Sequence, residues 1–110
     1  MIRVAIVEDQ ALVREGIRRL LALESEIAVI ASAEDGQQAL EMIPTANADV
    51  LLLDMRLPGL SGLDVMRRLA ERGQLPPTII LTTFDDDEIL LEGVRAGARG
   101  YLLKDVSLAE

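Results

Sequence analysis

The sequence contains no cysteine and no histidine. Without cysteine the chain forms no disulfide and offers no thiol nucleophile or thiolate metal ligand. Without histidine it lacks the Ser-His and Cys-His pairs that activate nucleophiles, and it also lacks the usual zinc sites. Aromatic residues are scarce, with only Phe84 and Tyr101 in the whole chain. This leaves little to stack on a flavin or a nucleobase.

Long apolar runs are also missing, since none approaches the roughly 18 residues that a membrane span needs. The first residues lead directly into a strand-like pattern, and no signal peptide is visible. The net charge is -8, which should repel the phosphate backbone of nucleic acids but suits a hard cation or a basic partner surface. We therefore expect a cytoplasmic protein with no membrane contact.

The 110 residues are half hydrophobic, enough for one domain with its own core. Short apolar runs predict strands at 3–7, 27–33, 49–53, 78–81 and 100–103. Helical patterns fill the gaps, over 11–23, from Asp35 to near Pro44, from Ser61 to about Arg72, and from about 86 to 97. Such β-α alternation predicts a parallel sheet with helices on both faces.

Two details of the helices can be predicted. The helix over 11–23 should place five apolar residues on one face: Leu12, Val13, Ile17, Leu20 and Leu21. Ser107 and Glu110 have capping-box spacing, which announces a fifth helix that has only begun when the sequence ends. We expect residues 1–110 to be one domain of a longer protein. The lost helix should expose apolar surface and favour dimers or low stability.

Polar side chains follow the predicted strands, where open α/β sheets bind their ligands. Glu8 and Asp9 follow the first strand, Asp54 the third, Thr82 and Thr83 the fourth, and Lys104 the fifth. Crowded carboxylates repel one another, and a bound cation removes that cost. Oxygen ligands without nitrogen or sulfur favour Mg²⁺, which can polarise a phosphoryl oxygen while a carboxylate attacks phosphorus. The set therefore suits an aspartyl-phosphate site.

Each residue also has a simpler interpretation. Glu8 and Asp9 could cap the first helix, and Asp54 could be a turn residue at a strand end. Lys104 alone is most often solvated, and Thr82 alone is usually satisfied by the backbone. The joint placement at one sheet edge is what favours a functional site.

With these residues identified, the chain resembles the receiver domain of bacterial two-component response regulators along its whole length. The resemblance rests on VEDQ (7–10), LDMRLPG (53–59), LTTF (81–84) and GARGYLLK (97–104). It implies a flavodoxin-like (CheY-like) three-layer α/β sandwich with strand order 2-1-3-4-5. TTFDDDE (82–88) and GYLLKD (100–105) resemble the LuxR/NarL-type subfamily, whose output domain is a helix-turn-helix.

The resemblance also implies roles for particular residues. Asp54 would be the phosphoacceptor, and Glu8, Asp9, Asp54 and the backbone carbonyl of Arg56 would hold Mg²⁺. Thr82 would be the switch hydroxyl, Lys104 the phosphate-binding lysine and Tyr101 the switch aromatic that turns inward. The expected partners are a sensor histidine kinase and a second copy of the chain. DNA would be bound only through an absent output domain, and the chain would catalyse only its own phosphorylation and dephosphorylation.

Three other functions were weighed. A flavodoxin-like cofactor binder would need a loop rich in Ser, Thr and Gly after the first strand, where this chain has Glu8, Asp9 and Gln10. A phosphohydrolase of the haloacid dehalogenase type would carry its nucleophile after the first strand, with a second Asp two residues on, whereas Arg56 stands two residues after Asp54. A degenerate receiver acting only as an interaction module is disfavoured because all the expected polar residues are present.

Overall fold

The structure, a computed structural model, describes residues 1–82 and 87–103. Strands and helices alternate along the chain: β1 (Ile2–Val7), α1 (Ala11–Ala22), β2 (Ile27–Ala33), α2 (Gly36–Ala46), β3 (Val50–Asp54), α3 (Gly62–Glu71), β4 (Thr78–Thr82), α4 (Asp87–Arg95) and β5 (Gly100–Leu103). All paired strands are parallel, in the order β2-β1-β3-β4-β5. This confirms the predicted sheet and its strand order.

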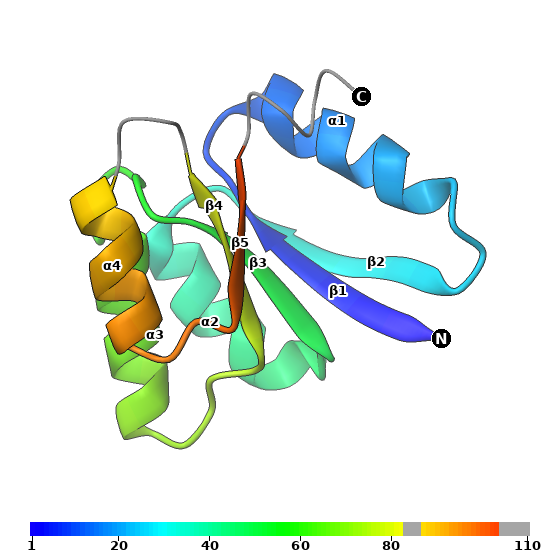
Figure 1. The fold of residues 1–110 in the computed structure, drawn as a ribbon. Helices are drawn as coiled ribbons and strands as arrows, with labels where there is room; N and C mark the ends of the chain where they lie inside the picture. Colours follow the sequence, from blue (N-terminus) through cyan, green and yellow to red (C-terminus); the bar gives the residue numbers. More distant parts are fainter. Residues whose placement is uncertain (83–86, 104–110) are drawn as a thin grey trace.

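The helices divide between the two faces of the sheet. Helix α1 lies on one face, over β1 and β2, whereas α2, α3 and α4 cover the other (Figure 1). Alternate side chains of β1 feed the two layers, because successive strand residues point to opposite faces. Val4 and Ile6 belong to the core layer beneath α1, while Ala5 and Val7 belong to the larger layer beneath the other three helices.

Two helix starts were predicted correctly. Asp35 is the N-cap of α2, and its Oδ1 accepts a hydrogen bond from the backbone N–H of Gln38 at 2.8 Å. Ser61 and Asp64 form a complete capping box at α3, in which each side chain accepts from the other residue's backbone N–H. These caps satisfy N–H groups that have no partner within the helix, and they fix where the two helices leave the loops that precede them.

The predicted apolar face of α1 was wrong in one respect. Leu12 is 90% exposed and Leu20 is 39% exposed, so the apolar face of α1 is narrower than expected. Ile17 and Leu21 pack against the sheet, and neighbouring residues in a helix point about 100° apart. Helix α2 ends at Ala46, two residues beyond Pro44, which agrees with the predicted stop near Pro44. Proline in the last turn removes one hydrogen bond, and the C-cap is Asn47, which adopts left-handed backbone angles.

Two further expectations can be compared with the structure only in part. Residues 104–110, where a fifth helix was expected to begin, lie outside the described residues. The consequences drawn from a missing helix therefore stay predictions. In the part of the chain that is described, every helix is too short or too polar to span a lipid bilayer.

Candidate acidic metal site

The register of the central strands brings the predicted site residues to one edge of the sheet. Val7 of β1 pairs with Leu53 of β3, so the residue after each, Glu8 and Asp54, reaches the same level. Asp54 in turn pairs with Leu81 of β4, and Thr82 is the residue after Leu81 on that strand. The three polar residues therefore sit side by side at the carboxyl ends of three neighbouring strands, as the sequence predicted.

The carboxylates of Glu8, Asp9 and Asp54 form a compact cluster. One oxygen atom from each lies within 4.8 Å of the other two. Glu8 is completely buried and Asp54 is 3% exposed, whereas Asp9 is exposed. Two of the carboxyl groups therefore lie inside the protein and the third is open to solvent, so a small cation could approach the group from the Asp9 side.

Backbone N–H groups from the following loops support both buried carboxylates. The N–H of Gln10 donates to Glu8 Oε2 at 3.0 Å, and the N–H of Arg56 donates to Asp54 Oδ1 at 3.0 Å. The second bond spans two residues, as in an Asx-turn, so Asp54 also fills the turn role considered above. The capping role for Glu8 and Asp9 has less support. The N-cap of α1 is Gln10, and the cap lacks a side-chain hydrogen bond.

The remaining predicted residues are placed as follows. Thr82 is buried at the end of β4, next to Leu103 of β5. Tyr101 lies on the edge strand β5, paired with Ile80, and 53% of it is exposed. Arg56 is exposed, and the expected role of its backbone carbonyl stays a prediction. Lys104 lies outside the described residues, so its predicted place near Asp54 stays a prediction.

Two residues at the site were missed by sequence reasoning. A Cβ atom at Gly62 would come within 2.6 Å of Met55 Cα and closer still to the Asp54 carbonyl, so only glycine fits there. The side chain of Arg14 donates a hydrogen bond to the carbonyl oxygen of Glu8 at 2.8 Å. Neither residue has a local sequence signal, because both contacts join segments that only the fold brings together.

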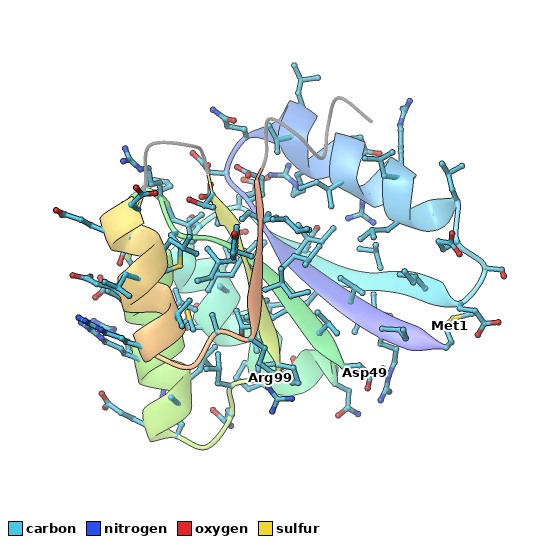
Figure 2. All side chains as sticks on the ribbon, viewed as in Figure 1. Met1, Asp49 and Arg99 are labelled. Carbon is cyan, nitrogen blue, oxygen red and sulfur yellow. The ribbon has the colours of Figure 1, made fainter. Side chains whose placement is uncertain are left out.

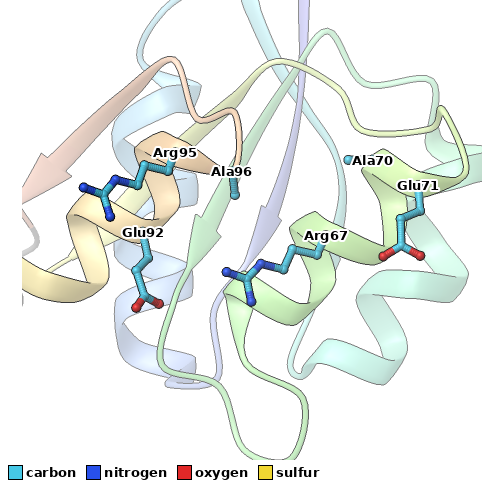
Figure 3. Close-up of a pocket in the computed structure, with 6 residues that line it drawn as sticks. All are labelled: Arg67, Ala70, Glu71, Glu92, Arg95 and Ala96. Atoms are coloured by element: carbon cyan, nitrogen blue, oxygen red, sulfur yellow. The ribbon is translucent and has the colours of Figure 1, made fainter.

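One surface pocket lies away from the acidic cluster. It has a volume of about 370 Å³ and lies between α3 and α4, where it is lined by Arg67, Ala70, Glu71, Glu92, Arg95 and Ala96 (Figure 3). The residues that line it carry two positive and two negative charges, and none belongs to the acidic cluster. The candidate site is therefore identified by its chemistry and its place at the sheet edge, not by a cavity.

The opposite edge of the sheet carries a different acidic residue. Asp49 precedes β3 and lies near the start of that strand, far from the strand ends that carry the cluster (Figure 2). Its Oδ2 accepts a hydrogen bond from the backbone N–H of Arg3 at 2.8 Å and lies 3.5 Å from Arg3 Nε. The backbone hydrogen bond, followed by that from the guanidinium, lowers the pKa of Asp49 below its ordinary value.

A parallel sheet of this order, with clustered carboxylates at the carboxyl ends of its strands, is the architecture that the resemblance to receiver domains implied. Residues 4–110 match the model of the response regulator receiver domain. The chain belongs to this family.

Relatives and solved structures agree with that assignment. The chain is 38% identical to the transcriptional regulatory protein YdfI of Bacillus subtilis, over 97% of this chain and 50% of the relative. It is 42% identical to the nitrate/nitrite response regulator protein NarP of Escherichia coli, over 94% and 48%. A LuxR-family two-component response regulator from Aurantimonas superposes with a TM-score of 0.88 at 31% identity, covering 98% of this chain and 77% of that one. The chain spans about half the length of the curated relatives it matches.

Proposed function

We propose that this receiver domain is a switch that accepts a phosphoryl group on Asp54 from a sensor histidine kinase. The observation that carries the proposal is the clustering of Glu8 and Asp9 around Asp54, within 4.8 Å, at the carboxyl edge of the sheet. A lone buried aspartate at a strand end would be expected to have a structural role. An aspartate held beside two further carboxylates is costly unless a cation joins them.

The donor set fits Mg²⁺. Its ligands would be the carboxylates of Glu8, Asp9 and Asp54, with the backbone carbonyl of Arg56, and Glu8 could act through water. All are hard oxygen donors, and the exposure of Asp9 leaves room for the waters that Mg²⁺ usually keeps. When bound, the ion would neutralise the cluster and polarise a phosphoryl oxygen.

The transfer itself is a substitution at phosphorus. A carboxylate oxygen of Asp54 forms the new O–P bond while the N–P bond of the phosphohistidine breaks, and the imidazole nitrogen keeps the electron pair. Thr82 and Lys104 would hold the phosphoryl oxygens as charge develops on them. The domain would thus catalyse only its own phosphorylation and the later hydrolysis, and it would turn over no separate substrate.

The conformational change would be transmitted from Asp54 to strands β4 and β5. Ile80 and Thr82 are two residues apart on β4 and share one face of the sheet. Tyr101 pairs with Ile80, so it is placed on that same face of the neighbouring strand. We expect the charge of the acyl phosphate to draw Thr82 toward it and Tyr101 to turn inward from its exposed position.

The output would be control of transcription. YdfI is a transcriptional regulatory protein, and the Aurantimonas structure is of the LuxR family. Because those chains are longer than this one, the DNA-binding part would belong to a segment outside this sequence. A net charge of -8 agrees with a receiver that does not itself bind DNA.

Acetyl phosphate, Mg²⁺ and intact-mass measurement test the proposal. The parent chain should gain one phosphoryl group, and Asp54→Ala should gain none. Asp49→Asn is the matched control, because it removes a carboxylate at the far edge of the sheet and should leave the adduct unchanged. An adduct that persists in Asp54→Ala would reject the assignment.

A further inference from the structure

Arg14 is the least exposed of three arginines on α1 that form ion pairs. Its side chain is 16% exposed, compared with 39% for Arg18 and 82% for Arg19. Its Nη1 donates to the carbonyl oxygen of Glu8 at 2.8 Å, and its Nη2 lies 3.5 Å from Glu34 Oε1. One guanidinium therefore joins the segment after β1 to the segment after β2.

Both residues that anchor this guanidinium have their backbone N–H groups held by hydrogen bonds. The N–H of Glu8 donates to the carbonyl of Ala33 at 3.1 Å, which ties the end of β1 to the end of β2. The N–H of Glu34 donates to Gln38 Oε1 at 2.9 Å, in the first turn of α2. Arg14 thus links the acidic segment to a part of the fold that is already fixed at α2.

The bond to Glu8 acts on the peptide unit that matters most for the site. The Glu8 carbonyl belongs to the peptide that connects Glu8 to Asp9, the two residues that supply two of the three clustered carboxylates. On the far side, the N–H of Gln10 fixes Glu8 Oε2. With the carbonyl held by Arg14, the orientation of this peptide is restrained, and with it the position of the Asp9 backbone from which the third carboxylate projects.

We propose that Arg14 is a positioning residue of the cation site, and that it raises the affinity for Mg²⁺ by fixing the Glu8–Asp9 peptide. The inference rests on the proposed function, since it assigns a role toward the same acidic cluster. It goes beyond that function because Arg14 contributes no ligand and carries a charge of the wrong sign to attract a cation.

Because Arg14 is positively charged, a positioning role and a purely electrostatic role predict opposite effects of its removal on Mg²⁺ affinity. If only charge mattered, removing a guanidinium beside an acidic cluster would strengthen cation binding. If Arg14 positions the ligands, its removal should weaken binding, because residues that orient metal ligands typically contribute 10–100-fold to affinity. We expect Arg14→Gln to raise the Mg²⁺ dissociation constant about tenfold, the lower end of that range, since the contact is to a carbonyl.

Arg18→Gln is the matched control. Arg18 lies one helical turn later, and its Nη2 donates to Ser32 Oγ on β2 at 3.0 Å. It therefore also tethers α1 to the sheet, and it has the same charge, but it does not contact Glu8. Calorimetric titration of the whole chain with Mg²⁺ should give an unchanged dissociation constant for Arg18→Gln and a raised one for Arg14→Gln.

Phosphorylation kinetics with acetyl phosphate provide a readout that lost stability alone would not produce. In Arg14→Gln the Mg²⁺ concentration for half-maximal rate should rise, while the rate at saturating Mg²⁺ returns to that of the parent. Glu34→Gln should shift the half-maximal concentration in the same direction, and the double variant should fall short of the sum of the two effects. If Arg14→Gln folds poorly, Arg14→Lys should still weaken Mg²⁺ binding, because it keeps the charge but has a single nitrogen where the guanidinium uses Nη1 for Glu8 and Nη2 for Glu34.

Unchanged or tighter Mg²⁺ binding in folded Arg14→Gln or Arg14→Lys would overturn the positioning role and leave the proposed function standing. So would a slow rate that saturating Mg²⁺ does not restore. A parent chain that neither binds Mg²⁺ nor gains a phosphoryl group would reject the proposed function, and this inference with it.

Discussion

At the scale of single residues, the site places two carboxylates where water cannot solvate them fully. Glu8 is completely buried and Asp54 is 3% exposed, and each accepts a backbone N–H from the loop that follows it. Such bonds offset part of the cost of burying charge, but they do not cancel the mutual repulsion within the cluster. A cation would therefore stabilise the folded protein as well as prepare it for reaction.

Glu8→Gln should separate these two effects. The substitution preserves shape and removes one buried charge, so in metal-free buffer the free energy of unfolding should rise by on the order of 1 kcal/mol. The same change should weaken Mg²⁺ binding and reduce the stabilisation that Mg²⁺ provides. Urea unfolding with and without Mg²⁺ measures both, and a variant stabilised by Mg²⁺ as strongly as the parent would exclude Glu8 from the cation site.

At the scale of elements, α3 begins directly against the end of β3. Gly62, its first residue, donates its N–H to the Met55 carbonyl at 2.9 Å, and its Cα faces the backbone of Asp54 and Met55. The capping box at Ser61 fixes the helix start at this point. The two ends of the loop that carries Arg56 are thus joined by a backbone hydrogen bond between Gly62 and Met55. This contact helps to hold the proposed phosphoacceptor in place.

Gly62→Ala should disturb this junction. The added methyl group overlaps backbone atoms that cannot move aside as a flexible side chain would, so we expect a loss of about 1–3 kcal/mol in the free energy of unfolding and slower phosphorylation. Gly100→Ala is the control, because a Cβ there meets nothing within 4 Å. Equal stability of the two variants in urea unfolding would contradict the close approach.

The start of β3 allows a prediction of pH dependence. The pKa of Asp49 is lowered by its hydrogen bonds to Arg3, so the contact stabilises the fold above the unfolded-state pKa of about 3.9 and is lost as pH falls through the lower folded-state value. Asp49→Asn should therefore be less stable than the parent near neutral pH, and the difference should shrink on acidification below about pH 4. If the difference in urea midpoint between Asp49→Asn and the parent stays constant from neutral to strongly acidic pH, the ionised Asp49 carboxylate is not the source of that difference.

At the scale of the whole molecule, much of the architecture could be read from periodicity and strand-end chemistry. Apolar runs located all five strands, and the polar residues after them identified the clustered carboxylates of Glu8, Asp9 and Asp54. Contacts between distant segments could not be read in this way. The bond from Arg14 to Glu8 depends on how α1 turns back over β1, and the exposure of Leu12 depends on which stripe of α1 meets the sheet.

The sheet as a whole also explains how the site could be specific. The cluster lies where two neighbouring parallel strands end: Glu8 and Asp9 follow β1, and Asp54 ends β3. Thr82 ends the next strand, β4, in a register that the whole sheet maintains. Specificity would come from this fixed arrangement of charges, whereas the pocket between α3 and α4 has mixed charge and no part in the cluster. Signal and output would then share one sheet, through Thr82 and Tyr101 on neighbouring strands.

The central claim is that Asp54 receives the phosphoryl group. Its most direct test is to phosphorylate the chain with acetyl phosphate and Mg²⁺, reduce the acyl phosphate with borohydride, and map the modified residue by peptide mass spectrometry. Reduction converts a phosphorylated aspartate to homoserine, and the account predicts homoserine at position 54 alone. Homoserine at position 9 or at another aspartate, with Asp54 unmodified, would contradict it.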